Sequence, residues 1–159
     1  MPTHRAPKLT CTQHGAEANA LVTYWRERNE LEVREKQWFM AALTLGCALE
    51  AMLYAYFIIW SGHDVNDPAK DAQISVKLNL NDLLETAKRI DLLTPVKFKD
   101  EFGDHAVHDV VHEIRSLRNN IHAGVALGRS FDPTAFRRDN YLRIAGIFDA
   151  VVSNFERAL

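Results

Sequence analysis

Histidine, arginine and asparagine side chains recur at helical spacing between residues 105 and 124. At about 100° per residue they would form one polar stripe along a single helix, opposite an apolar face. Imidazoles exchange protons near neutral pH and guanidinium groups bind phosphate. The stripe therefore predicts either acid–base chemistry on an anionic ligand or contact with a partner. Its members are His105, His108, His112, Arg115, Asn119 and His122.

The three histidines at the start of the stripe do not have the spacing of a metal site. His105 and His112 would lie about 10 Å apart along a helix axis. A zinc ion with nitrogen ligands at about 2.0–2.1 Å needs ligands that converge more tightly. The sequence also lacks an HExxH or CxxC motif. We therefore expect no metal and no cofactor, and place these histidines on a solvated or interface face.

The end of the stripe allows two interpretations. Arg115 and Arg118 supply planar donors suited to phosphate, and His122 can exchange a proton. Asn119 can orient either the imidazole or a ligand. In the alternative, Arg118 and His122 stabilise the end of their own helix, and Arg115 pairs with Glu50 in the core. The residues alone leave both interpretations open.

Length and composition predict one globular domain. The 159 residues are 47% hydrophobic and 25% charged, with a formal net charge of −2. This charge argues against a surface that is basic throughout, although residues 114–143 hold six arginines and only two acids. The two cysteines, Cys11 and Cys47, follow no disulfide or zinc pattern, and the N-terminal residues show no apolar leader. We expect a cytoplasmic protein.

The segment from Trp38 to Trp60 is long and apolar enough to span a bilayer. Glu50 near its centre would cost roughly 2.5–3.5 kcal/mol there. Its many small residues instead let neighbouring helices approach closely. We therefore predict a central helix buried on all sides and no membrane contact, with a transmembrane helix as the alternative. The small residues are Ala41, Ala42, Gly46, Ala48, Ala51 and Ala55.

The pattern along the chain predicts an all-α protein, an antiparallel bundle of four to five helices. Residues 1–15 are expected to form a flexible arm and residues 16–159 a single helical-bundle domain. The first helix, over residues 16–29, should continue with little break into the apolar segment. Residues 62–77 are rich in turn formers and predict a loop.

Three local signals place helix ends in the second half of the chain. Asn79 or Asn81 can cap a helix. Gly124 should end the striped helix. Asp132 followed by Pro133 predicts the start of the final helix.

Two separated segments resemble the HEPN superfamily of bacterial helical proteins. The first is the GxxxE run within ALTLGCALEAMLYAYF, and the second is the RxxRNxIHxG helix end within EIRSLRNNIHAG, followed by the Asp-Pro signal. The resemblance covers residues 38–159. It implies a four- to five-helix bundle that is commonly dimeric. Several members are metal-independent endoribonucleases, toxins or nucleic-acid-defence components, and others are not catalytic.

The resemblance implies roles for particular residues, because the superfamily motif is an arginine followed after four to six residues by a histidine. Arg115 and His122 match with six residues between them. His122 would activate the ribose 2′-hydroxyl or protonate the leaving oxygen, and Arg115 with Arg118 would stabilise the phosphate charge. Arg118-Asn119 matches the Arg-Asn start of the motif better, but it leaves only three residues before His122. Which arginine acts with His122 stays open.

The remaining site residues and partners follow from the same resemblance. His112 is expected to bind substrate together with Arg118 and Asn119, and Glu50 to support the site. RNA is the expected substrate, and an antitoxin or another protein is the expected partner. Tyr24 and Trp25 on the first helix, together with the long polar stripe, predict a homodimer, because aromatic and arginine side chains anchor interfaces. Its interface is expected to use either the striped helix or the N-terminal helix pair. The alternative is a non-enzymatic dimeric module whose stripe is a structural or partner interface.

Overall fold

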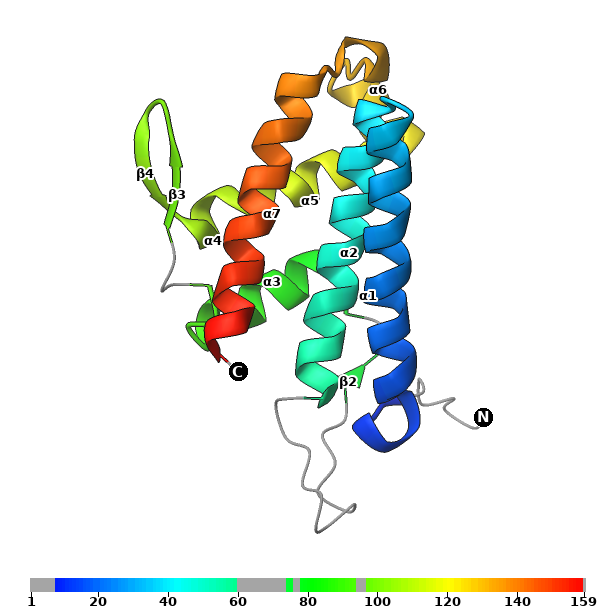
Figure 1. Ribbon diagram of the computed structural model, residues 1–159, viewed down its shortest axis with the longest axis vertical. Coiled ribbons are helices and arrows are strands. Elements are labelled where there is room, and N and C mark those ends of the chain that lie inside the picture. The colour runs from blue at the N-terminus through cyan, green and yellow to red at the C-terminus, as the bar shows by residue number, and fades with distance from the viewer. Residues whose placement is uncertain (1–7, 60–73, 76–77, 94–96, 159) are drawn as a thin grey trace.

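The computed structural model describes residues 8–59, 74–75, 78–93 and 97–158 (Figure 1). Helices dominate these ranges, so the predicted all-α class is confirmed. Two short antiparallel ribbons accompany the helices. In one, β1 (Lys8–Leu9) pairs with β2 (Ile74–Ser75). In the other, β3 (Lys97–Asp100) pairs with β4 (Gly103–Ala106).

The first two helices form an antiparallel hairpin, α1 (Cys11–Arg34) and α2 (Trp38–Ile59). The expectation of a nearly continuous helix here is wrong, because the chain reverses at Lys36, where φ is 57°. Backbone amides of Glu35, Lys36 and Gln37 donate to carbonyls in the last turn of α1. These hydrogen bonds stabilise the turn, although Lys36 stands at a left-handed position that is usually occupied by glycine.

The N-terminal end of α1 lies inside the segment expected to be a flexible arm. The helix begins at Cys11 because the Thr10 hydroxyl accepts a hydrogen bond from the Gln13 amide at 3.4 Å. His14 Nδ1 accepts one from the Thr10 amide at 3.0 Å. Reciprocal capping therefore starts the helix within the predicted arm, while residues 1–7 lie outside the described residues.

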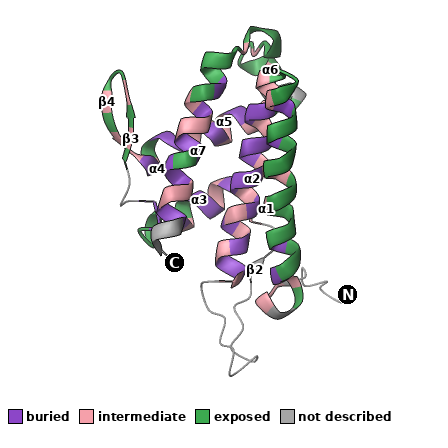
Figure 2. Cartoon of the chain, in the orientation of Figure 1, coloured by how far each residue is buried: buried purple, intermediate pink, exposed green. Residues whose placement is uncertain are grey.

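Helix α2 is the centre of the molecule, as its sequence predicts. It contacts α1, α3 (Leu80–Arg89), α5 (His112–Asn119) and α7 (Arg138–Ala158). Buried positions cover most of its circumference (Figure 2), and one face, with Cys47, Glu50 and Tyr54, is only half-buried. By length and composition it is also the one helix in the described residues that could cross a membrane, but 61% of its apolar window is buried inside the protein. Such burial is typical of the core helix of a bundle.

The helices form two layers rather than a simple antiparallel bundle. Figure 1 shows α2 between α1 and α7, with the shorter α3 and α5 crossing at an angle. A buried polar residue joins the three long helices. The Asn29 amide donates to the Ala41 carbonyl at 2.7 Å and to the Thr44 hydroxyl at 3.2 Å, and its oxygen accepts from the Tyr141 hydroxyl at 3.3 Å.

The polar stripe does not lie on one helix, so that prediction is wrong. His105 belongs to β4, which pairs with β3, and Gly103 closes this hairpin with φ of 117°. The helical part is divided into α4 (Val107–Val110) and α5. After α5, the amides of residues 120–122 bond to carbonyls three residues earlier, which ends the helix before His122.

The predicted capping signals have mixed outcomes. Asn79 caps α3, and its side chain forms a reciprocal capping box with Asp82. Gly124 lies inside α6 (Ala123–Gly128) and does not end the striped segment. Asp132 caps only the 3₁₀ turn η2 (Pro133–Ala135), and α7 begins later. Most of the predicted 62–77 loop lies outside the described residues.

Candidate functional site

The site is organised by a close crossing of α2 and α5. A Cβ atom added to Gly46 would lie 3.3 Å from the Cβ atom of Arg118 and 3.6 Å from a methyl group of Ile114. Only glycine leaves α5 free to approach this closely. The approach lays the stem of Arg118 on α2, one turn from Glu50. Gly46 and Glu50, the GxxxE pair of the sequence, therefore act together on Arg118.

Arg118, and not Arg115, is the partner of Glu50. The Arg118 Nη2 atom lies 2.6 Å from Glu50 Oε2, and the two side chains are only 26% and 21% exposed. The structural alternative in the sequence, a Glu50–Arg115 pair, is therefore wrong. Three residues of helix rotate Arg115 by about 60° away from Arg118. Among the described residues Arg115 forms no ion pair, and its buried Nε atom has no hydrogen-bond partner.

A pocket of about 260 Å³ brings most of the predicted site residues together. It lies between the N-terminal end of α3 and the C-terminal end of α5. The α3 end contributes Asn79, Leu80 and Asn81, which the sequence suggested only as a capping region. The residues contributed by α5 and the turn after it are Arg115, Arg118, Asn119 and His122.

The electrostatics of this pocket favour an anion. Glu50 balances the charge of Arg118, whereas the charge of Arg115 stays available. The N-terminal end of α3 also borders the pocket, but there the Asp82 carboxylate already accepts a hydrogen bond from the Asn79 amide. His122 is exposed in the turn after α5, so its imidazole can meet a ligand in the pocket. Arg115 and His122 together offer a fixed positive charge and a proton-exchanging group.

His112 does not line this pocket. It lines a second one with Asp109, Asn120 and other residues, and its Nε2 atom lies 3.4 Å from Glu85 Oε1. Burial and the nearby charge of Arg115 lower its pKa below the usual value. The structure therefore does not bring His112 together with Arg118 and Asn119 in one pocket.

The other stripe histidines also have local partners. His105 Nε2 lies 2.8 Å from Asp100 Oδ1, and His108 Nε2 lies 3.0 Å from Asp109 Oδ1. They are separated because β4 and α4 direct them to different neighbours. In the part of the chain that the structure describes, no group of three or more His, Cys, Asp or Glu side chains converges as metal ligands would.

Sequence reasoning missed an ionic network that joins the β3–β4 hairpin to α5 and α7. Arg143 donates to Asp100 at 2.7 Å and twice to Glu113 at 2.8 Å, and its guanidinium lies 5.3 Å from the centre of the Phe98 ring. Hydrogen bonds from Arg143 and His105 lower the pKa of Asp100 to about 2. Arg143 is thus removed from the predicted basic patch. Its partners are far away in sequence, so no local spacing indicated them.

The pocket at the α3–α5 end can therefore bind a phosphate and exchange a proton beside it. Arg115 supplies the charge, Asn119 and the α3 asparagines supply neutral hydrogen-bonding groups, and His122 supplies the proton exchange. No protein-family model, curated protein or solved structure matches the chain.

Proposed function

We propose that the pocket between α3 and α5 binds a phosphate group of RNA, and that Arg115 and His122 cleave the chain there without a metal ion. The observation that carries this proposal is the shared pocket, in which the uncompensated Arg115 charge borders the exposed His122 imidazole. The helical fold and the RxxRNxIHxG segment support it through the resemblance to the HEPN superfamily. Cytoplasmic RNA is the proposed substrate.

The proposed reaction uses the RNA's own 2′-hydroxyl as nucleophile. His122 accepts its proton, the oxygen attacks the adjacent phosphorus, and the bond to the 5′-oxygen breaks as that oxygen takes a proton from water. The proton on His122 then returns to the solvent. The products are a 2′,3′-cyclic phosphate and a 5′-hydroxyl. Arg115 stabilises the additional negative charge on the phosphate oxygens. Arg118 is a positioning residue in this proposal, because its charge is held by Glu50.

The test is incubation of the purified protein with mixed RNA and with DNA, in the presence and absence of EDTA. We expect RNA to be cut to cyclic-phosphate ends, no effect of EDTA, and intact DNA. Arg115→Ala and His122→Ala should each abolish cleavage without unfolding the protein, because neither side chain is part of the buried core. Exposed Arg138 gives a matched control, since Arg138→Ala should keep full activity.

Two outcomes would contradict the assignment in different ways. Full cleavage by both variants would show that other residues act. RNA binding without cleavage by the wild-type protein would leave a binding site and remove the catalytic role of His122.

A second proposal is a dimeric interaction module, which a separate observation favours. The outer side of α1 exposes two large side chains, Tyr24 and Leu31. These positions lie close together on one helix face. In this proposal the protein pairs with itself or with an antitoxin-like protein, and the Glu50–Arg118 pair is structural. Absence of RNA binding together with stable self-association would favour this module over the nuclease.

A further inference from the structure

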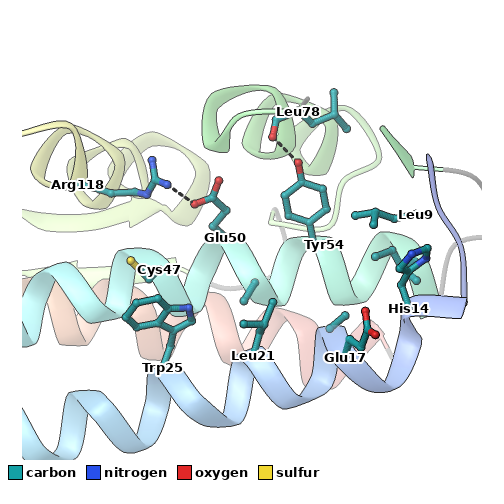
Figure 3. Close-up of a pocket in the computed structure, with 13 residues that line it drawn as sticks. Leu9, His14, Glu17, Leu21, Trp25, Cys47, Glu50, Tyr54, Leu78 and Arg118 are labelled. Atoms are coloured by element: carbon teal, nitrogen blue, oxygen red, sulfur yellow. Dashed lines mark hydrogen bonds and ion pairs between the residues drawn. The ribbon is translucent and has the colours of Figure 1, made fainter. Parts of the chain in front are cut away.

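A third pocket, of about 420 Å³ and larger than the one between α3 and α5, lies across α2 (Figure 3). Trp25 and Leu21 border it from α1, and Glu50 and Tyr54 border it from α2. Leu78, just before α3, forms part of the opposite side, where the Tyr54 hydroxyl donates a hydrogen bond to its carbonyl. We call this pocket the α1–α2 groove.

The walls of the groove suit a flat apolar ring. Trp25 is partly buried and packs against the core, so its indole is held in place. Ala51 lines the groove from α2, and its small side chain leaves space above the helix. An indole beside such a space provides a surface on which an aromatic ring can stack.

The polar end of the groove offers an acceptor next to a donor. Glu50 Oε2 lies 2.6 Å from Arg118 Nη2, and Figure 3 shows the other carboxylate oxygen pointing away from Arg118. The guanidinium of Arg118 has further N–H groups. A ligand edge that donates to Glu50 and accepts from Arg118 would match this arrangement.

The charges of the groove disfavour a second phosphate. Two carboxylates, Glu17 and Glu50, border it, and the only arginine among its lining residues is already paired with Glu50. Burial raises the pKa values of Cys47 and Tyr54, so both groups are uncharged near neutral pH. The groove therefore favours a neutral ring with polar edges.

Arg118 connects the groove to the candidate catalytic pocket, because it lines both. We propose that the groove binds a nucleobase, guanine in preference to the others, from the nucleotide whose phosphate lies at Arg115. The guanine N1–H and N2–H groups would donate to Glu50, O6 would accept from Arg118, and Trp25 would stack on the ring. This inference rests on the proposed function and adds base selection to it.

The first experiment measures the affinities of guanosine, inosine, uridine and GMP by NMR titration of the wild-type protein. Guanosine should bind best, and inosine, which lacks the N2 amino group, about tenfold more weakly. Trp25→Leu should weaken guanosine binding about tenfold through loss of stacking. Ala51→Leu fills the groove without removing an aromatic ring, and it should also weaken guanosine binding about tenfold. Phe102→Leu, an exposed aromatic residue that does not line the groove, is the matched control and should leave the affinity unchanged.

The second experiment separates the groove from the phosphate pocket. Arg115→Ala should weaken GMP binding but leave guanosine binding unchanged, because guanosine carries no phosphate. Glu50→Gln should reduce the preference for guanosine over uridine. The same experiment tests whether the ligand is a free nucleotide or a nucleotide unit of RNA. Free guanosine and GMP are added to the RNA cleavage reaction, and the cut sites are mapped. Inhibition of cleavage by both compounds, together with cut sites that follow guanine, would support a guanine of RNA as the ligand.

Several results would overturn the inference. Unchanged guanosine binding in both folded groove variants would show that the groove is not the base site. A guanosine affinity that falls as protein concentration rises would show that a second copy of the chain covers it. If RNA is neither bound nor cut while guanosine binding still depends on Trp25, the nuclease proposal fails and the base pocket stands. If RNA cleavage depends on Arg115 but not on Trp25, the base-pocket inference fails and the nuclease proposal stands.

Discussion

Arg115 and Arg118 have the same side-chain chemistry but different surroundings. Gly46 lets α2 approach α5 only beneath Arg118, which therefore reaches Glu50. Arg115, one turn earlier, keeps its charge for a ligand in the 260 Å³ pocket. The distinction depends on a contact between helices, so the motif in the sequence could not show which arginine pairs with Glu50.

The first prediction concerns the Glu50–Arg118 pair. Arg118→Gln should destabilise the protein by about 1–3 kcal/mol, because it leaves the mostly buried Glu50 carboxylate without its partner. The double variant with Glu50→Gln should recover part of that loss. Urea unfolding of the wild type, both single variants and the double variant gives the coupling energy. Arg115→Gln is the control and should change stability by less than about 0.5 kcal/mol, and a coupling energy near zero would contradict the pair.

His112 gives a prediction about pH. Burial and Arg115 lower its pKa, so the folded protein binds this proton less readily than the unfolded chain. The contribution of His112 to the free energy of unfolding should therefore be constant above the pKa of the unfolded chain, about 6.5. It should be lost as the pH falls below that pKa. His112→Gln should reduce the loss of stability measured by urea unfolding between pH 7.5 and pH 5. An identical loss in wild type and variant would show that His112 is not responsible.

At the scale of elements, the strongest sequence patterns were the most reliable. The long apolar run predicted the buried helix α2, and Asn79 predicted the start of α3. The prediction that the polar stripe lies on one helix was wrong, because spacing alone cannot show that residues 103–106 pair with β3. The sequence did not predict the turn at Lys36, because the turn contains neither glycine nor proline. In both places contacts with distant residues replace the local signal.

The close approach of α2 and α5 gives a prediction at this scale. Gly46→Leu should separate the two helices, destabilise the protein by about 1–3 kcal/mol, and weaken ligand binding at the pocket that Arg118 borders. Gly124 is a matched control, because no atom lies within 4 Å of a Cβ added there. Gly124→Ala in α6 should be neutral or stabilise by up to about 1 kcal/mol. Thermal unfolding compares the variants, and equal melting temperatures would contradict the close contact.

At the scale of the whole molecule, the two pockets lie on either side of the Glu50–Arg118 pair. Helix α2 supplies Glu50, α5 supplies Arg118, and the start of α3 borders the smaller pocket. Helix α1 closes one side of the larger groove and turns much of its length outward (Figure 2). The outward side of α1 belongs to neither the core nor the phosphate pocket.

The last prediction is that the protein forms a homodimer through this outward side of α1. Tyr24 and Leu31 are 55% and 38% exposed and lie on the same helix face, seven residues apart. Aromatic and large apolar side chains are typical anchors of interfaces, and a two-fold contact buries the same patch of both copies. Light scattering over a concentration series should give twice the 18.1 kDa mass of one chain. Leu31→Lys should return the protein to a monomer while leaving guanosine binding unchanged, since Leu31 does not line the groove. A wild-type mass that stays at 18.1 kDa at tens of micromolar would exclude this dimer.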